Sequence, residues 1–377
     1  MKIVIITGEE SGDRLGAALM DSLKTLYKGD INLYGIGGNE LKRHNIQNFF
    51  HLSAINVMGI IEVIPKIFKI KKIINQTVLQ IININPDIVI TIDSPDFNLR
   101  IASAIKIKNK NIKIMHYVAP SVWNWRAGRI NTVKKNIDHL LTILPFEKKI
   151  FDKALVPTTF VGHPVTDIDL NKYSYLDSKD TEKPLFLILP GSRRSEVSRL
   201  LSIFIDAIEI SSFKDSFDFV LPTTESMKSE VNQILSSKKI SFDIKVIDNE
   251  DKKYEFFYLA DYAVIASGTV GLELSYFGVM YISAYKFHPI SYFIFKMMIK
   301  TKLGNLINII LGKMIIPELI QYDCNSVSIS KALKKLINDI DYKELIKKDV
   351  NEAVAQLSTN SYSSLIASEA LMKLINK

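Results

Sequence analysis

Short runs of β-branched and other apolar residues alternate along the chain with longer segments in which apolar residues follow helical spacing. In the first half these patterns predict helices at Gly12–Leu26 and Ile67–Asn83, among others. The apolar runs there predict strands at Lys2–Thr7, Asn32–Gly35, Ile88–Ile92, Ile112–Tyr117 and Leu140–Ile143. A second series of strands is predicted at Leu185–Leu189, Phe217–Pro222, Asp243–Ile247, Tyr262–Ala266 and Met280–Ala284.

Two such series predict two domains, because strand–helix alternation is typical of a parallel sheet covered by helices on both faces. The 377 residues are also too many for one ordinary core. We therefore expect an α/β protein with two doubly wound, Rossmann-like domains, residues 1–170 and 183–345, facing each other across a cleft. The polar stretch Asp167–Lys183 is expected to link them, and residues 346–377 to form a C-terminal helical tail.

Composition narrows the classes of function. The net charge of +8 favours an anionic partner, and the basic residues are mixed with Ile, Phe and Leu in a way that suits a membrane surface, although a plain solvated face explains them too. No zinc-finger or RNP pattern indicates nucleic acid. The single cysteine, Cys324, excludes an intrachain disulfide and fits a reducing compartment. No stretch approaches the ~20 apolar residues of a membrane span, and the first apolar run is too short for a signal peptide.

The residues that follow each strand are the candidate site residues, because doubly wound sheets bind ligands beyond the carboxyl ends of their strands. After the first strand, the chain reads Gly-Glu-Glu-Ser-Gly-Asp, from which Glu10, Ser11, Gly12 and Asp13 are candidates. Glycines at a helix start let the backbone approach a ligand, and the neighbouring acids favour a sugar over a phosphate. An ordinary helix N-cap by Ser11 or Asp13 explains the same residues equally well.

A pair of carboxylates, Asp93 and Asp96, follows the strand Ile88–Ile92, with Asn98 close behind. Such a pair can serve proton transfer when the pocket raises one pKa and leaves the other group ionised. Alternatively, Asp93 caps the turn and Asp96 caps the next helix. We expect one structural and one catalytic residue.

Both tryptophans, Trp123 and Trp125, fall in the loop after Ile112–Tyr117, together with Arg126 and Arg129. Aromatic rings stack on the apolar faces of sugars, and arginine can hold a phosphate. His116 lies in the same segment, but a lone histidine is more often a structural residue than a base.

Two loops of the second half have the design of phosphate-binding helix starts. The first contains Gly191, Ser192, Arg193 and Glu196, and the second contains Ser267, Gly268, Thr269 and Glu273. Small residues at a helix N-terminus can cradle a diphosphate, and arginine can neutralise it. Glu273 could accept hydrogen bonds from a ribose or simply face solvent. Together the loops predict a nucleoside diphosphate site.

Metal ligands with the usual spacing are missing. The six histidines are scattered, and the Asp-x-Asp triplets at 167–169 and 339–341 fall in the expected linker and near the tail, where solvated acids are the better interpretation. We expect neither a metal nor another cofactor.

Taken together, these loops resemble the signature blocks of the lipid-A-disaccharide synthases. The blocks occur in family order as Gly8–Asp13, Val57–Glu62, Ile92–Asn98, His116–Arg126, Leu144–Glu147, Gly162–Pro164, Leu189–Glu196 and Ser267–Glu273. The resemblance implies a GT-B fold without a required metal, with the acceptor in the first domain and the nucleotide in the second. It implies inverting transfer of 2,3-diacylglucosamine from its UDP derivative to the 6-hydroxyl of 2,3-diacylglucosamine 1-phosphate, giving a β-1,6-linked disaccharide 1-phosphate and UDP.

Residue roles follow from the same resemblance. It implies that Asp96 is the base and that Arg193 is the partner of the diphosphate. With Asp96 as the base, we expect Glu10 and Asp93 to support it or to contact sugar. It also implies that Met58 is a substrate contact and that Asn308, Glu318 and Gln321 lie near the nucleotide.

The nearest alternative function is that of another GT-B enzyme, such as a nucleotide-sugar 2-epimerase. The peptidoglycan N-acetylglucosaminyl transferase expects a first loop Gly-Gly-Thr-Gly-Gly-His, which this chain lacks, and a lipid-binding protein without catalysis is a third alternative.

The expected place of action is the cytoplasm, peripheral at the inner face of the bacterial inner membrane. Between Ile60 and Ile74, apolar residues follow helical spacing with Lys66, Lys69, Lys71 and Lys72 interspersed, as in an interfacial helix. A core helix with snorkelling lysines explains the periodicity as well, and the acylated substrates favour a contact with anionic lipid. The sequence leaves open whether the chain forms a homo-oligomer.

Overall fold

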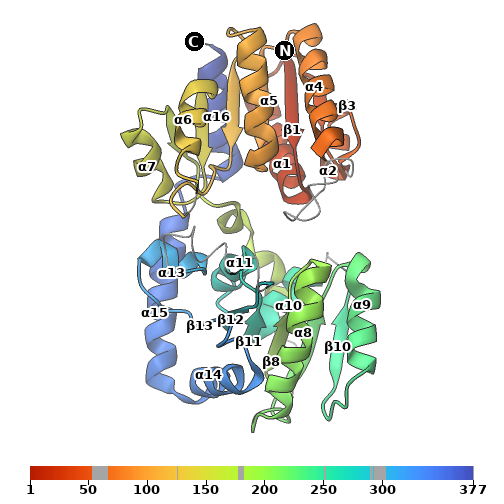
Figure 1. The fold of residues 1–377 in the computed structure, drawn as a ribbon. Coiled ribbons are helices and arrows are strands. Elements are labelled where there is room, and N and C mark those ends of the chain that lie inside the picture. Colours follow the sequence, from red (N-terminus) through yellow and green to blue (C-terminus); the bar gives the residue numbers. More distant parts are fainter. Residues whose placement is uncertain are drawn as a thin grey trace. The chain divides into compact units, whose positions relative to one another are not determined.

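The computed structural model describes residues 1–52, 67–124, 126–176, 182–249, 252–288, 292 and 303–376. The chain divides into two compact units. Unit 1 is Met1–Asp167 with Leu357–Lys377, and unit 2 is Ile168–Gln356. Figure 1 shows helices flanking the sheet in each unit. The chain therefore passes from one unit to the other twice, and the expected C-terminal tail is divided between them.

The described part of unit 1 contains a seven-stranded sheet in the order β3-β2-β1-β4-β5-β6-β7, and every neighbouring pair is parallel. Its strands are β1 (Lys2–Thr7), β2 (Asn32–Ile36), β3 (Gln47–Asn48), β4 (Ile88–Ile92), β5 (Ile114–Tyr117), β6 (His139–Thr142) and β7 (Thr158–Phe160). Its helices are α1 (Glu10–Leu26), α2 (Asn39–Lys42), α4 (Ile67–Ile84), α5 (Pro95–Lys108), α6 (Arg129–Asn136), α7 (Glu147–Lys153) and α16 (Ser363–Ile375).

Alternate residues of the central strands build two cores, one on each face of this sheet. Ile3 and Ile5 of β1 pack in a cluster with residues of α1 and α16, whereas Val4 and Ile6 pack in a cluster with residues of α4, α5 and α6. Because β1 and β4 are buried on both faces, they need continuous apolar runs, which is why the sequence marks them so clearly.

The described part of unit 2 contains a six-stranded parallel sheet in the order β10-β9-β8-β11-β12-β13. Its strands are β8 (Leu185–Leu189), β9 (Asp218–Pro222), β10 (Ile244–Ile247), β11 (Ala260–Ile265), β12 (Met280–Tyr285) and β13 (Glu318–Ile320). Its helices are α8 (Arg194–Glu209), α9 (Glu225–Ser236), α10 (Lys253–Leu259), α11 (Val270–Tyr276), α13 (Leu306–Leu311), α14 (Ser326–Asn338) and α15 (Ile340–Leu357), the last ending at the second passage to unit 1.

The segment expected to be a polar linker is more structured than its composition indicates. It contains the last residue of one 3-10 helix, Pro164–Asp167, and the whole of another, Leu170–Leu176. Tyr173 is buried and its ring lies 6.0 Å from the rings of Tyr258 and Phe277 in unit 2. Asp167 is not the solvated acid that we expected, because its carboxylate accepts hydrogen bonds from the backbone N–H and the hydroxyl of Ser363 at the start of α16.

The strand order places one point of reversal in each sheet. The chain runs outward from β1 through β2 to β3, and then continues on the other side of β1 with β4. In unit 2 the corresponding neighbours are β8 and β11. Ligands of open α/β sheets bind beyond the carboxyl ends of the strands at such points. The loops after β1, β4, β8 and β11 are therefore the places to look for a site.

Candidate functional site

The loops after β1 and β4 touch each other at the reversal point of unit 1. A Cβ atom on Gly8 would lie 2.0 Å from the hydroxyl oxygen of Ser94, so only glycine fits there. Asp93 and Ser94 have φ angles of 51° and 43°, in the left-handed region that residues other than glycine rarely adopt. Such strain persists only where the surroundings impose it, and it is concentrated at functional sites.

Asn98 of α5 holds this strained turn in place. Its side-chain amide donates hydrogen bonds to the backbone oxygens of Ile92, at 3.0 Å, and of Asp93, at 2.8 Å. Asn98, a candidate substrate contact, is fully buried, and these bonds give it a positioning role in this structure. Burial raises the pKa of Asp93, against a smaller opposing effect of the Ser94 backbone N–H. Asp93 is therefore held rigidly and is more basic than an ordinary aspartate.

Asp96, in the first turn of α5, has the opposite environment. Arg126 and Arg129 both contact its Oδ1 atom, the former at 2.6 Å. Partial burial alone would raise the pKa of Asp96, but the Arg129 hydrogen bond and the charges of Arg129, Arg126 and Arg100 outweigh it and lower the pKa. The structure thus separates the pKa values of the two carboxylates, with Asp96 the more acidic of the two.

A hollow of about 370 Å³ lies beside Asp96, between α5 and α6. Asp96, Arg100 and Arg129 contribute charge to its lining, and Leu99, Ala104 and Ile107 contribute apolar surface. The Ile107 side chain is 83% exposed.

The loop after β1 divides its four candidates into exposed and buried residues. Glu10 and Ser11 are exposed at the start of α1, whereas Gly12 and Asp13 are buried. The Asp13 carboxylate accepts hydrogen bonds from the backbone N–H groups of Gly38, at 2.6 Å, and of Glu40, at 2.8 Å. This geometry caps α2 and favours a structural role for Asp13, which leaves Glu10 and Ser11 available to a ligand.

His116 is a core residue, which agrees with the expectation that a lone histidine is more often structural than catalytic. It is fully buried, its Nδ1 atom lies 2.7 Å from the Thr91 hydroxyl, and burial lowers its pKa to about 4. Trp123 packs edge-on against Phe146 at 5.3 Å between ring centroids. Met58 and Trp125, two further candidates, lie outside the described residues.

In unit 2, Gly191 after β8 has a φ angle of 109°, and a Cβ atom there would lie 2.3 Å from a carboxylate oxygen of Glu196. Ser192 follows, and Arg193 immediately precedes α8, with its guanidinium 3.3 Å from Glu196 and its side chain 54% exposed. The Tyr285 hydroxyl donates to the same Glu196 oxygen at 3.5 Å. The loop therefore presents an exposed arginine at the N-terminus of a 16-residue helix.

The loop after β11 joins a hydrogen-bonded network. The Ser267 hydroxyl donates to the backbone oxygen of Gly304 at 3.4 Å, and the Gly304 N–H donates to Glu318 at 2.7 Å. The amide of Asn308, which is fully buried, donates to the other oxygen of Glu318 at 2.6 Å. The structure thus brings together three candidates, Ser267, Asn308 and Glu318, which are far apart in the sequence.

The remaining candidates of unit 2 border this network. Gly268 has a φ angle of 155°, and Thr269 immediately precedes α11. Gln321 is buried and its side chain pairs with the backbone of Phe287.

Glu273 is not a solvent-facing acid, because Lys253 lies 2.6 Å and the Tyr254 hydroxyl 3.1 Å from its carboxylate oxygens. Sequence reasoning missed Lys253, Tyr254 and Tyr285. These side chains come from other elements, and no local pattern marks them.

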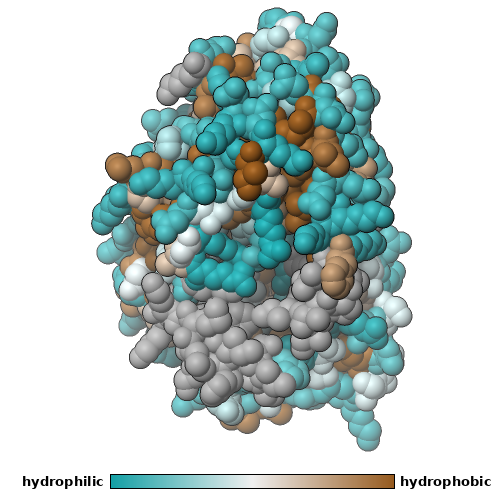
Figure 2. Space-filling model, turned by 45° about the horizontal axis from the view of Figure 1, so that its top comes forward, coloured by the Kyte–Doolittle hydropathy of each residue, from teal (hydrophilic) through white to brown (hydrophobic). Residues whose placement is uncertain are grey.

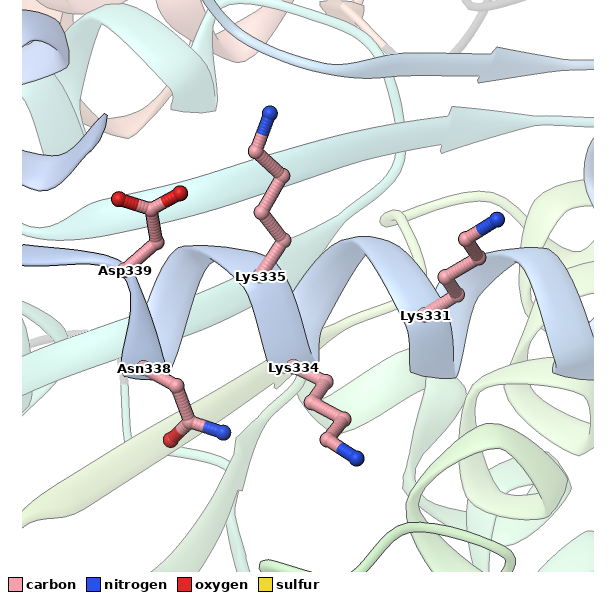
Figure 3. Close-up of a pocket in the computed structure, with 5 residues that line it drawn as sticks. All are labelled: Lys331, Lys334, Lys335, Asn338 and Asp339. Atoms are coloured by element: carbon pink, nitrogen blue, oxygen red, sulfur yellow. The ribbon is translucent and has the colours of Figure 1, made fainter.

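A second hollow, of about 350 Å³, lies along α14 and is lined by Lys331, Lys334, Lys335, Asn338 and Asp339. Figure 3 shows that all five side chains come from this one helix and its end, with Lys335 and Asp339 on one side and Lys334 and Asn338 on the other. Asp339 caps α15 by accepting from the Tyr342 N–H at 3.0 Å. The lysines near the end of α14 suit the helix dipole.

The described residues contain no group of three or more His, Cys, Asp or Glu side chains arranged to hold a metal ion. No helix among them is both long and apolar enough to cross a membrane.

The sequence profile of the family described as lipid-A-disaccharide synthetase matches residues 3–371. The lipid-A-disaccharide synthase of Rhodospirillum centenum is 34% identical, over 100% of this chain and 95% of that protein. The enzyme of Rickettsia prowazekii is 35% identical over 98% of each chain. This chain belongs to the lipid-A-disaccharide synthase family.

Membership in the lipid-A-disaccharide synthase family makes the chain a glycosyltransferase of lipid A biosynthesis. Solved structures agree on the fold. The UDP-GlcNAc 2-epimerase of Neisseria meningitidis has a TM-score of 0.66 at 14% identity, covering 99% of this chain and all of that one. MurG of Acinetobacter baumannii has a TM-score of 0.60 at 13% identity, covering 99% of each. These likenesses establish the GT-B fold and nothing about the substrate.

Proposed function

We propose that the chain transfers 2,3-diacylglucosamine from its UDP derivative to the 6-hydroxyl of 2,3-diacylglucosamine 1-phosphate, forming a β-1,6-linked disaccharide 1-phosphate and UDP. The observation that carries the proposal is a pair of complementary loops at the two points of strand reversal. Unit 1 offers a basic carboxylate in a strained turn at Asp93, and unit 2 offers a helix start with the exposed Arg193.

The acceptor hydroxyl must lose its proton as it attacks the anomeric carbon, and a carboxylate within reach is the simplest base. Sequence reasoning placed this role on Asp96. The environments of the two carboxylates favour Asp93, because its pKa is raised whereas that of Asp96 is lowered by arginines. We therefore propose Asp93 as the base, with Asp96 orienting Arg126 and Arg129.

The leaving UDP carries negative charge that the site must stabilise. We propose that Gly191 and Ser192 present backbone N–H groups to the diphosphate and that Arg193 pairs with it, since anions bind at helix N-termini. Ser267, Gly268 and Thr269 would contribute a second helix start. Asn308 and Glu318 would support that loop from within. Asn308 donates to Glu318, Glu318 accepts from the Gly304 N–H, and the Gly304 carbonyl oxygen accepts from Ser267.

The sugar parts of the substrates would meet the remaining exposed groups. Glu10 and Ser11 can bond sugar hydroxyls at the start of α1, and Trp123 lies in the same loop as Arg126. Gln321 and Glu273 act through their neighbours, because each is already engaged by backbone or side-chain partners.

We also propose that the protein acts in the cytoplasm at the inner face of the bacterial inner membrane. The described part of the expected interfacial helix supports this. The Phe68 side chain is 85% exposed and is flanked by the exposed Lys69, Lys71 and Lys72, while Ile73 and Ile74 are buried. Elsewhere the visible face in Figure 2 is largely hydrophilic, with hydrophobic residues in small groups.

The decisive experiment incubates the protein with the UDP-activated acylated sugar and the acylated sugar phosphate and measures UDP release and disaccharide formation. We expect both products in equal amounts, and neither when the acceptor is omitted. UDP release without acceptor, or conversion of the donor to its 2-epimer, would overturn the proposal.

A further inference from the structure

Three arginines surround one carboxylate at the start of α5. Arg126 and Arg129 contact Asp96 directly, and the charge of Arg100 also acts on it. Three positive charges and one negative charge leave this cluster with a net charge of +2. The Arg126 and Arg129 side chains are 40% and 13% exposed, so the cluster is partly shielded from water. Charge of one sign in a partly shielded place favours an anionic ligand.

The hollow between α5 and α6 adjoins this cluster and provides space for a ligand beside the arginines. Arg100 and Arg129 line the hollow together with Leu99, Ala104 and Ile107. Ile107 is 83% exposed although it is a large apolar residue. Arginines beside an apolar wall suit an amphiphile whose anionic group meets the guanidinium groups and whose apolar part lies along α5.

We propose that Arg100, Arg126 and Arg129 bind the phosphate monoester of the acylated sugar acceptor. This inference rests on the function proposed above and adds to it the residues that recognise the acceptor. Guanidinium groups match phosphate oxygens with paired hydrogen bonds. Before the acceptor binds, Asp96 holds Arg126 and Arg129 in place, so that little side-chain entropy is lost on binding.

The assignment also explains the division of labour between the two carboxylates. Asp93 lies between β4 and α5, three residues before Asp96 in the first turn of α5. Phosphate held by the arginines fixes one end of the acceptor sugar, and the hydroxyl that attacks is at its other end, directed to Asp93.

Kinetics with two acceptors test the proposal. The acceptors are the acylated glucosamine 1-phosphate and the same acylated glucosamine without phosphate. We expect Arg100→Gln and Arg129→Gln to raise KM for the phosphorylated acceptor by about 10- to 100-fold. They should leave KM for the UDP-sugar and the rate with the phosphate-free acceptor nearly unchanged. Lys108→Gln and Lys135→Gln are matched controls on α5 and α6, outside the hollow.

A general loss of structure would affect both acceptors equally, and Arg129→Lys, which keeps the charge, should restore part of the preference. The proposal is overturned if the arginine variants keep the wild-type preference for phosphate. It is also overturned if they lose binding to anionic vesicles and nothing else, because the arginines would then serve the lipid surface.

A binding measurement separates this proposal from the proposed function. Glucosamine 1-phosphate should raise the melting temperature of the wild type and fail to raise that of Arg129→Gln. If the wild type forms no disaccharide yet still shows this difference, the proposed reaction fails and the phosphate site stands. If glucosamine 1-phosphate stabilises both proteins equally, the phosphate site fails whatever the reaction.

Discussion

Asp93 and Asp96 lie three residues apart but differ in what surrounds them, and their substitution should therefore affect different kinetic constants. We expect Asp93→Asn to lower kcat by roughly 10²–10⁴, because the amide cannot take the proton of the acceptor. Asp96→Asn should mainly raise KM for the acceptor, because it releases Arg126 and Arg129. Initial rates with both substrates varied provide the measurement. A large loss of kcat in Asp96→Asn with near-normal turnover in Asp93→Asn would return the base to Asp96.

Arg193 should act on the leaving group. Arg193→Ala is expected to lower turnover by ~10²–10³ while the protein stays folded, since one electrostatic contact with developing charge typically contributes that much. Arg194→Ala is the matched control, because Arg194 is 76% exposed and pairs with Glu230.

We expect the enzyme to remain active in EDTA, because arginine and helix N-termini would stabilise the negative charge of the leaving UDP. Loss of activity with EDTA and its recovery with magnesium would contradict this.

Glu147 is a buried carboxyl with a measurable effect on stability. Burial raises its pKa to about 8, against the N–H groups of Leu144 and Ile143 and the side chain of Trp123. Between the unfolded pKa of 4.5 and about 8, the folded state keeps a proton that the unfolded state releases. The retained proton on Glu147 therefore stabilises the folded state fully below pH 4.5. This stabilisation declines as pH rises from 4.5 through about 8, by at most about 1.4 kcal/mol per pH unit.

Urea unfolding between pH 6.5 and 8, above the range in which the buried histidines act, would show this dependence. We expect Glu147→Gln to flatten the decline, because the amide has no proton to lose. His116 and His163, whose pKa values burial lowers to about 4, act with the opposite sign below pH 6.5 and should be unaffected. An identical slope in the variant would refute the assignment.

Helix α16 completes the core of unit 1 although it comes last in the chain. Leu371 and Ala367 pack in one cluster with Leu19 and Leu23 of α1, and the Ser368 hydroxyl donates to the Leu19 backbone oxygen at 3.1 Å. Leu371→Ala should lower the free energy of unfolding of unit 1 by about 2–5 kcal/mol. Lys373→Ala, at an exposed position of the same helix, should change it by no more than about 0.5 kcal/mol. Equal effects would show that α16 does not support the core.

The sequence predicted the central strands better than the edge strands, for a physical reason. β1, β4 and β8 have the predicted limits because strands buried on both faces need uninterrupted apolar runs. β3, β7 and β13 have two or three residues each and were not predicted, since so short a run leaves no pattern.

The candidate site was predictable to the extent that it follows strand ends. Gly191 and Arg193 were found because a glycine turn that opens a helix is a local signal. Asp13 and Asn98 have the residue types of ligand contacts, but both bond backbone groups instead. Asp13 bonds the N–H groups of Gly38 and Glu40, and Asn98 bonds the backbone oxygens of Ile92 and Asp93, so only the fold assigns them to support. The sequence did not indicate Arg100 as a site residue, because Arg100 joins the cluster only through the packing of α5 beside Arg129 of α6.

Binding to a lipid surface depends on which side chains the folded protein exposes, and substitution of Phe68 tests it. We expect the wild type to bind anionic liposomes at low salt and Phe68→Glu to bind about 10-fold or more weakly, because an exposed aromatic ring is lost among lysines. Leu79→Glu, on the same helix and 50% exposed, is the control. Sedimentation with vesicles measures both, and added salt should weaken binding of the wild type. Equal binding by Phe68→Glu would place the contact elsewhere.

The two passages of the chain between the units have a consequence for biosynthesis. Unit 1 is made in two parts, residues 1–167 and 357–377, and unit 2, residues 168–356, is made between them. On the ribosome, residues 1–167 must therefore wait for α16, with the apolar surface that α16 covers still open, until unit 2 has been synthesised. Domains generally fold as units during synthesis, and exposed apolar surface promotes aggregation. Residues 1–167 should thus be the more aggregation-prone part during synthesis, and a stop codon before α16 should destabilise unit 1, whose sheet lies far upstream, more than unit 2.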